Sequence, residues 1–206
     1  MKDAMNDAKV ARSNLRTSLR ELRGKISLKR QQEAASSLAA RCLSILDINT
    51  HAHVAGYFAV GGEIAVDQIL ANVRSRGGVS YAPVLSEGNT LRFAPFDDHT
   101  TMIGNKFNIK EPDVTSSDYL MPAELDAVLV PLVGFDKSRN RMGMGGGFYD
   151  RSFAHRNKAA GKPFLIGVAY DLQQADSVYP DWWDVKLDVI VTESQVIDQA
   201  SEAASD

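Results

Sequence analysis

Apolar residues near the N-terminus recur with the period of an α-helix. Spacings of four, three and four residues separate Leu15, Leu19, Leu22 and Ile26, which predicts a helix over residues 8–26 with one apolar face. A basic stripe runs parallel to this face, about 100° around the helix. The arginines of that stripe are Arg12, Arg16, Arg20 and Arg23. A solvated helix face and a binding surface for an anion are both consistent with it.

Further helices are predicted from start and stop signals. Ser27 is a favourable N-cap for a helix that continues to Ile45, and a pair of glycines ends a third helix over residues 66–76. A fourth helix is expected over residues 149–160. The second helix has apolar positions that are expected to face inward, namely Leu38, Cys42, Leu43 and Leu46.

Six short apolar runs predict β-strands. They span residues 53–58, 79–83, 91–95, 127–133, 164–168 and 189–192. The run at 127–133 (AVLVPLV) is apolar without interruption, which is typical of a central strand covered on both faces. Strands that alternate with helices indicate an α/β fold: an open, twisted, mostly parallel sheet with helices on both faces, in a Rossmann-like three-layer arrangement. Such sheets bind ligands beyond the carboxyl ends of their strands.

The chain is expected to form one domain. Its 206 residues are 44% hydrophobic and 24% charged, which is ordinary for a globular protein, and no linker or repeat interrupts them. Residues 1–197 are therefore assigned to a single domain, and the polar residues 198–206 to a frayed tail. The single cysteine, Cys42, excludes a disulfide framework. Because no run of about 18 apolar residues occurs, the sequence predicts a cytoplasmic protein without a membrane segment.

Charge is distributed unevenly along the chain. The formal net charge is −3, yet residues 1–41 hold ten Lys or Arg against four Asp or Glu. An anionic small ligand, nucleic acid or a solvated helix face would each account for this basic segment. Nucleic acid is disfavoured because the chain as a whole is acidic and does not interleave aromatic with basic residues.

The segment 134–151 (GFDKSRNRMGMGGGFYDR) carries the clearest chemical signal. It leaves the predicted central strand and places four glycines within five residues: Gly143, Gly145, Gly146 and Gly147. Such glycines let a ligand approach the backbone, and successive N–H groups at the start of a helix bind anions. Arg141 and Arg151 flank the glycines and could fork onto phosphate oxygens. A polyphosphate is therefore the indicated ligand, although neither the P-loop nor the dinucleotide motif is matched.

Aspartates near this segment are candidate metal ligands. Asp150 follows the glycines, where a carboxylate could hold Mg²⁺ against phosphate oxygens. A second carboxylate could come from Asp184 or Asp188 in the segment DVKLD. Helix capping or surface salt bridges would explain the same aspartates, so both interpretations stay open. The four histidines show no metal-ligand spacing.

The motif NRMGMGGGFYDR resembles N-R-L-G-x-G-x-G-[FY]-Y-D-R of the 5-formyltetrahydrofolate cyclo-ligase family, also called 5,10-methenyltetrahydrofolate synthetases. IKEP at 109–112, GEIAVDQIL at 62–70 and LDVIVTE at 187–193 support the resemblance, which covers residues 12–192. It implies a ligase that requires Mg²⁺ and converts 5-formyltetrahydrofolate and ATP into 5,10-methenyltetrahydrofolate, ADP and phosphate. In such enzymes ATP phosphorylates the formyl oxygen, and N10 then attacks the activated carbon.

The resemblance also implies roles for individual residues. Arg141 and Tyr149 match candidate catalytic positions. Arg12 stands where the family has a lysine, and Arg139 stands where the family commonly has glycine. The nucleotide contacts that the resemblance implies are Arg12, Arg16, Arg141, Met142, Gly143, Met144, Gly145, Gly146, Gly147, Phe148 and Tyr149.

The remaining implied positions concern the folate and the metal. Phe58 can stack on a pterin and Glu63 can accept its N–H donors, while Asp150 and Asp188 match the Mg²⁺ ligands. The implied partners are ATP and 5-formyltetrahydrofolate, with or without a polyglutamyl tail, and the chain is expected to be a monomer or weak oligomer. Neither nucleic acid nor a membrane is implied.

Two other functions fit the residues. A binding or regulatory protein could keep affinity for folate and nucleotide without turnover. A sugar-phosphate isomerase or acyl transferase could use a similar sheet, and it would need no ATP.

Overall fold

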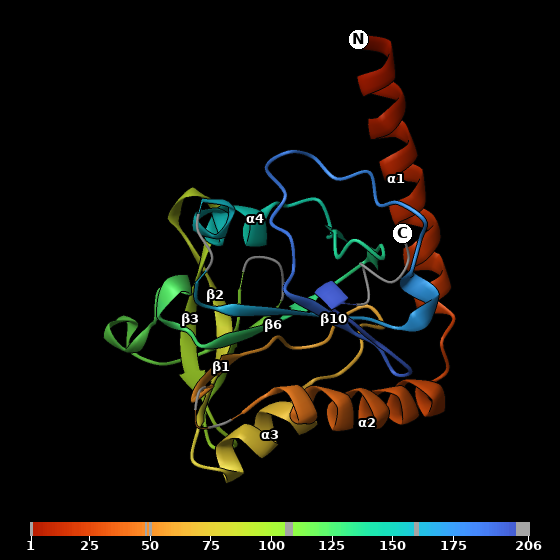
Figure 1. Ribbon diagram of the computed structural model, residues 1–206. Coiled ribbons are helices and arrows are strands. Elements are labelled where there is room, and N and C mark those ends of the chain that lie inside the picture. The colour runs from red at the N-terminus through yellow and green to blue at the C-terminus, as the bar shows by residue number, and fades with distance from the viewer. Residues whose placement is uncertain (1, 48, 50, 106–108, 159–160, 201–206) are drawn as a thin grey trace.

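The computed structural model describes residues 2–47, 49, 51–105, 109–158 and 161–200. Its centre is a seven-stranded sheet with β6 as the middle strand (Figure 1). The four inner pairs, from β10 to β2, are parallel, whereas β11 and β3 pair antiparallel at the two edges. In spatial order the strands are β11 (Val196–Ile197), β10 (Val189–Val191), β9 (Phe164–Val168), β6 (Ala127–Pro131), β1 (His53–Ala55), β2 (Val79–Ser86) and β3 (Thr90–Phe96).

Helices cover both faces of this sheet. In Figure 1, α2 (Leu28–Ile45) and α3 (Asp67–Ser75) lie below it, α4 (Phe148–Ser152) lies above it, and α1 (Lys2–Gly24) stands at one side. The predicted fold class, a mostly parallel α/β sheet between layers of helices, is confirmed.

The central strand β6 is buried on both faces. Ala127 and Leu129 belong to the core that contains α2 and α3, whereas Val128 and Val130 belong to the core on the α4 side. Successive side chains of a strand alternate between faces, so an uninterrupted apolar run can supply both cores. The predicted central strand is therefore confirmed, although it ends at Pro131, two residues before the predicted end.

The first two helices follow the predicted pattern with one exception. Ser27 caps α2, since its Oγ accepts a hydrogen bond from the Arg30 N–H at 3.3 Å. In α1, Leu19 is buried, but Leu22 is 46% exposed and Arg23 is only 3% exposed. The inward prediction for Leu22 is wrong because the buried side of α1 includes Arg23, whose guanidinium binds carbonyls of the neighbouring loops.

The strand predicted over residues 53–58 is shorter in the structure. It ends at Ala55 because the chain then folds back, and the Tyr57 hydroxyl donates to the Ile64 carbonyl at 2.6 Å. The segment that follows β1 is thus a loop at the carboxyl edge of the sheet.

The helix predicted over residues 149–160 is also shorter. It ends at Ser152, and Phe153 turns into the core on the α4 side. The Ser152 hydroxyl accepts a hydrogen bond from Leu91 N–H at 2.8 Å, so contacts with β3 override the local helical pattern. A 3₁₀ turn, η4 (Ala154–Asn157), follows, and the last two residues of the predicted helix lie outside the described residues.

Several short elements were not predicted. They lie in polar or glycine-rich segments, where no apolar period extends over enough residues. Besides β11, they are the hairpins β4 (Met102–Gly104) with β5 (Lys110–Pro112) and β7 (Gly134–Phe135) with β8 (Arg141–Met142), and the 3₁₀ turns η2 (Ser116–Asp118), η3 (Pro122–Glu124) and η5 (Asp171–Gln173). The turn between β2 and β3, which the sequence Glu87-Gly88-Asn89 predicts, is the 3₁₀ turn η1 (Glu87–Asn89).

Among the described residues, no helix is long and apolar enough to cross a membrane. The domain boundary at residue 197 stays a prediction, because most of the predicted tail, residues 201–206, lies outside the described residues.

Candidate active site

A glycine loop, residues 143–147, joins β8 to α4. Gly145 and Gly147 have φ values of +97° and +66°, which side chains rarely adopt. A Cβ at Gly146 would lie 2.6 Å from the Phe148 ring. The loop can take this shape only with glycine at these positions, so the sequence determines the local backbone.

The loop leaves its backbone donors unused. Within the described residues, no group accepts a hydrogen bond from the N–H of residues 143–147. Met144, Gly145 and Gly146 are exposed, so these donors are open to solvent. A run of unpaired N–H groups is the arrangement that binds phosphate oxygens. Because α4 has only five residues, the attraction comes from these N–H groups and nearby arginines rather than from a long helix dipole.

Arg141 connects the loop to the opposite chain segment. Its side chain is 6% exposed, and its Nη2 lies 2.6 Å from Asp150 Oδ1. Its Nη1 donates to the Val185 carbonyl at 2.5 Å, while Val185 N–H donates to Asp150 Oδ1 at 3.1 Å. Asp150 Oδ2 accepts no hydrogen bond from a described residue, so one carboxylate oxygen remains available beside the loop.

Arg151 has a different role from the one predicted. It donates to the Gly146 carbonyl, and to the Asn89 carbonyl at 3.0 Å, and its guanidinium lies 5.6 Å from the centre of the Phe148 ring. These contacts brace the loop against η1. The expectation that Arg151 forks onto phosphate is therefore not supported by its geometry.

Met142 also has a structural role. Its side chain is fully buried in a cluster with Leu19 and Val133, and its carbonyl accepts a hydrogen bond from Val133 N–H at 2.8 Å. Its side chain is therefore unavailable to a ligand, in contrast to the exposed Met144 that follows.

The basic stripe of α1 reaches this site. Arg16 Nε donates to the Gly143 carbonyl at 2.9 Å, and burial together with the neighbouring Arg12 and Arg20 lowers the pKa of its guanidinium. Arg12 lies 2.7 Å from Asp181 and 2.6 Å from an oxygen of Asp184. The structure thus brings Arg12 and Arg16, two predicted nucleotide contacts, to the glycine loop and to the segment opposite it.

The two predicted metal ligands have different surroundings. Asp188 precedes β10, where it pairs with Arg156 at 2.5 Å and accepts a hydrogen bond from Leu165 N–H at 2.7 Å. These contacts hold it at the amino ends of β9 and β10, away from the carboxyl edge. Asp184, by contrast, directly precedes Val185, whose N–H binds Asp150. Of the two alternatives raised by the sequence, the structure favours Asp184 as the neighbour of Asp150.

Metal-binding side chains are sparse here. No group of three or more His, Cys, Asp or Glu among the described residues could hold a metal ion. Magnesium usually binds one or two carboxylates together with substrate phosphates and water, so a single free carboxylate oxygen at the loop fits this ion.

The predicted substrate-side residues lie at the loop after β1. Glu63 accepts a hydrogen bond from Val60 N–H at 3.1 Å and lies 3.7 Å from Arg23 Nη1. Burial raises the pKa of the Glu63 carboxyl, and these two partners partly oppose that shift. Phe58 packs against Phe96, with ring centres 5.3 Å apart.

Tyr149 lies in α4, two residues after the glycine loop. It is partly buried and stacks on Phe153 with ring centres 6.1 Å apart. Burial and the charge of Glu63 raise the pKa of its hydroxyl, whereas Arg141 lowers it. Its hydroxyl is therefore neutral at pH 7 and can donate a hydrogen bond.

Arg23 is a site residue whose position the sequence did not reveal. Its Nε donates to the Gly61 carbonyl and its Nη1 to the Leu132 carbonyl, both at 3.2 Å. It thereby joins the loop after β1 to the end of β6, and it supports Glu63. The basic stripe contained this residue, but periodicity cannot tell a buried arginine from a solvated one.

A cavity of about 600 Å³ lies elsewhere, at the amino edge of the sheet. Its lining includes Arg139, Arg156 and Asp188 and none of the glycine loop. The chemistry and this cavity therefore do not coincide. The candidate site is the loop, because its unpaired N–H groups and the nearby arginines can bind an anion. A cavity by itself does not indicate which ligand it would bind.

The fold and the site together define an α/β protein with a glycine loop of unpaired backbone donors at the carboxyl edge of its sheet. The chain belongs to the 5-formyltetrahydrofolate cyclo-ligase family, whose model matches residues 8–193. It is therefore an enzyme of this family, a ligase of folate metabolism, as the motif resemblance predicted.

Individual relatives agree with this assignment. A 5-formyltetrahydrofolate cyclo-ligase from Haemophilus influenzae is 34% identical over 183 residues, covering 87% of this chain and 97% of the relative. One from Escherichia coli K12 is 31% identical over 181 residues, covering 86% and 98%. The solved structure of an Aquifex aeolicus 5,10-methenyltetrahydrofolate synthetase is 26% identical with a TM-score of 0.77, covering 91% of this chain and 92% of that one.

Proposed function

We propose that this chain converts 5-formyltetrahydrofolate into 5,10-methenyltetrahydrofolate, using ATP and Mg²⁺ and releasing ADP and phosphate. Family membership and the names of the relatives support the folate conversion. The observation that carries the nucleotide part is the run of unpaired N–H groups at residues 143–147, flanked by Arg16 and Arg141. We further propose that the enzyme acts in the cytoplasm as a monomer or weak oligomer.

The chemistry requires a better leaving group than an amide-like formyl oxygen. The γ-phosphoryl group of ATP is transferred to this oxygen, which breaks the bond between the γ-phosphorus and the bridging oxygen and releases ADP. N10 then attacks the formyl carbon and releases its proton to solvent, and the carbon–oxygen bond breaks. The former formyl oxygen leaves as part of inorganic phosphate. Catalysis of this kind depends mainly on positioning and charge stabilisation, so no protein nucleophile is needed.

The residues of the site fit these demands. The loop N–H groups and Arg16 hold the phosphates in the ground state. Arg141, which lies at the junction of loop and substrate side, stabilises the charge that grows during transfer. The neutral hydroxyl of Tyr149 donates a hydrogen bond toward the reacting oxygens. Glu63 accepts N–H groups of the pterin, whose ring stacks on Phe58.

Asp150 is the proposed primary ligand of Mg²⁺, through Oδ2. Asp184 is the proposed second ligand in place of Asp188, and its carboxylate pairs with Arg12, whose Nη2 lies 2.6 Å from Asp184 Oδ2. A bound Mg²⁺ would neutralise phosphate charge and orient the γ-phosphoryl group. The charge pairs of Asp150 with Arg141 and of Asp184 with Arg12 keep both carboxylates oriented before the nucleotide arrives.

The test is an assay with 5-formyltetrahydrofolate whose formyl oxygen carries a heavy isotope. We expect the methenyl chromophore to appear together with equal amounts of ADP and phosphate, and the heavy oxygen to be in the phosphate. Heavy oxygen that is released into water, or that stays in the folate after turnover, would contradict phosphorylation of the formyl oxygen. Product formed without ATP would instead indicate a transferase, and binding without turnover would indicate a regulatory protein.

A further inference from the structure

A strap, residues 176–188, runs from η5 to β10 and is fastened to the active site from one side. Arg12 binds both Asp181 and Asp184, at 2.7 and 2.6 Å. The Val185 carbonyl accepts a hydrogen bond from the candidate catalytic arginine at 2.5 Å. In Figure 1 the strap is the blue segment that passes above the glycine loop and α4. Its backbone is thus held in place by the same residues that form the site.

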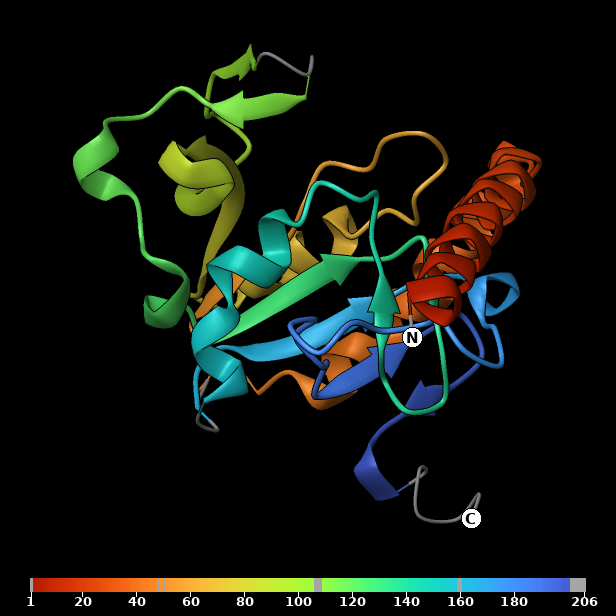
Figure 2. The same ribbon diagram turned by 90° about the horizontal axis from the view of Figure 1, so that it is seen from above.

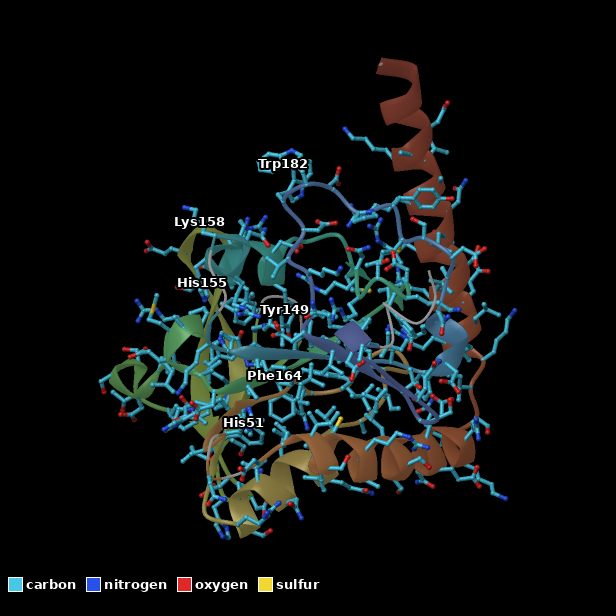
Figure 3. All side chains as sticks on the ribbon, viewed as in Figure 1. His51, Tyr149, His155, Lys158, Phe164 and Trp182 are labelled. Carbon is cyan, nitrogen blue, oxygen red and sulfur yellow. The ribbon has the colours of Figure 1, made fainter. Side chains whose placement is uncertain are left out.

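The outer part of this strap carries both tryptophans of the chain. Trp182 is 89% exposed and Trp183 is 48% exposed, with their ring centres 5.3 Å apart at an angle of 81°. Asn157 Nδ2 donates to the Trp183 carbonyl at 3.1 Å, so the backbone is supported while the indoles face solvent. Figure 3 shows Trp182 at the outermost point of the strap, farther from the sheet than Tyr149. Exposed aromatic surface on a fastened segment indicates a contact with a ligand.

The order of contacts across the site indicates which part of the substrates this surface meets. Glu63 lies on the loop after β1, where its partners are Val60 N–H at 3.1 Å and Arg23 Nη1 at 3.7 Å. Arg141 donates a hydrogen bond to the carbonyl of Val185, which belongs to the strap. The proposed folate side and the strap are therefore held by different residues, the first by Arg23 and the second by Arg12 and Arg141. Seen from above in Figure 2, the orange loop after β1 and the blue strap lie on different sides of the teal glycine loop.

A nucleotide whose phosphates occupy the glycine loop must place its base on one of these two sides. The side of Glu63 is taken by folate in the proposed reaction. On the other side, Arg16 holds Gly143, and one helical turn away Arg12 holds Asp181, the residue before Trp182. A base that leaves the phosphates in this direction meets the indoles. We propose that Trp182 and Trp183 form a stacking platform for the adenine of ATP, an inference that rests on the proposed function.

Replacing an aromatic side chain on which a base stacks typically lowers the affinity for the ligand by about 5- to 100-fold for each stacked base. The chain is suited to a direct test because all tryptophan fluorescence comes from the strap. The full-length protein is titrated with MgADP, and separately with inorganic tripolyphosphate, which has phosphates but no base. We expect MgADP to change the tryptophan fluorescence and tripolyphosphate to change it little. Trp182→Phe and Trp183→Phe then separate the contributions of the two rings.

A second experiment measures the affinities of Trp182→Ala, Trp183→Ala and the double variant for MgADP and tripolyphosphate by equilibrium dialysis. We expect weaker MgADP binding by about 5- to 100-fold, with tripolyphosphate binding unchanged. Leu28→Ala is the matched control, because Leu28 is 76% exposed but begins α2 on the other side of the sheet. Wild-type affinity of the double variant for MgADP, with tripolyphosphate still bound, would overturn the platform and leave the proposed function standing. Failure of the wild-type protein to bind either anion would overturn both.

Discussion

The amino and carboxyl edges of the central sheet differ in whether their polar groups have partners within the protein. At the amino edge, Asp126 accepts a hydrogen bond from His53 N–H at 2.8 Å and pairs with Lys162. Asp188 is satisfied in a similar way by a backbone N–H and by Arg156. At the carboxyl edge, within the described part of the chain, the glycine loop keeps its backbone donors unpaired.

This difference separates structural from functional charge. Carboxylates at the amino edge close gaps between neighbouring strands, and their partners are fixed. At the carboxyl edge, Arg16 and Arg141 each bind a protein group while the adjacent N–H groups remain free, which leaves these donors available to the proposed ligand. Asp150 and Asp188, which the family resemblance pairs as Mg²⁺ ligands, therefore have different expected roles.

The largest effect should separate these two aspartates. Asp150→Asn should lower kcat by about 10²- to 10³-fold and weaken the Mg²⁺ dependence, because the free carboxylate oxygen at the phosphates is lost. It should also cost about 1–3 kcal/mol of stability, since Arg141 keeps a hydrogen-bond acceptor but loses its opposite charge. Steady-state rates over a range of Mg²⁺ concentrations, together with thermal unfolding, measure both effects.

Asp188→Asn is the matched comparison at the amino edge. It should lower the melting temperature through the weakened contacts with Leu165 and Arg156, while kcat and the Mg²⁺ dependence stay close to wild type. If instead Asp188→Asn abolished the Mg²⁺ dependence and Asp150→Asn did not, the assignment of the two edges would be reversed.

A second comparison uses two arginines that each pair with an aspartate, the buried Arg141 and the partly buried Arg156. Arg141→Ala should lower kcat by about 10²-fold or more, the scale expected for a lost donor to developing charge. Arg156→Ala removes the equivalent partner of Asp188 and should lower stability without this loss of kcat. Rates at saturating folate and MgATP, normalised to the folded fraction, measure the difference. Equal losses of kcat in the two variants would show that Arg141 acts only through stability.

Within the carboxyl edge, Arg16 should act on binding rather than on turnover. Binding that is equal in the ground state and the transition state changes KM and leaves kcat nearly unchanged. Arg16→Ala should therefore raise the KM for ATP about 10- to 100-fold, the value of one charge-assisted hydrogen bond of about 1.5–3 kcal/mol. Arg20→Ala, on the exposed part of the same helix, is the control. An unchanged KM for ATP in Arg16→Ala would remove this arginine from the nucleotide site.

Long apolar patterns predicted the framework of the fold, and tertiary contacts decided the rest. The run 127–133 and the helix capped by Ser27 are found close to their predicted positions, because many residues of each carry the same period. The helix predicted over residues 149–160 stops early because Ser152 and Phe153 make contacts with β3 and the core that no local pattern contains.

The part of the candidate site that lies in one continuous segment of the chain was predictable from the sequence. The glycine loop and Asp150 follow one another along the chain, and their spacing alone indicates an anion site. The choice between Asp184 and Asp188 was not predictable, since both belong to one short motif and only the hydrogen bond from Val185 N–H to Asp150 separates them. The buried position of Arg23 was hidden for a similar reason, because its partners are backbone carbonyls that are distant in sequence.

The smallest expected effect concerns Glu63 and depends on pH. Burial raises the pKa of Glu63 above its ordinary value of 4.5, so the folded protein binds this proton more tightly than the unfolded chain does. Its contribution to stability is therefore present below the unfolded pKa and is lost as pH rises through the folded pKa. Glu63→Gln should flatten this part of the pH profile of the free energy of unfolding, measured by urea denaturation. Glu33→Gln, an exposed position on α2, should leave the profile unchanged. Because pterin N–H groups favour the charged carboxylate, the wild-type affinity for 5-formyltetrahydrofolate should rise over the same pH interval, and Glu63→Gln should lose that rise. Parallel pH profiles for the wild type and Glu63→Gln in both measurements would show that this carboxyl neither titrates with folding nor contacts the folate.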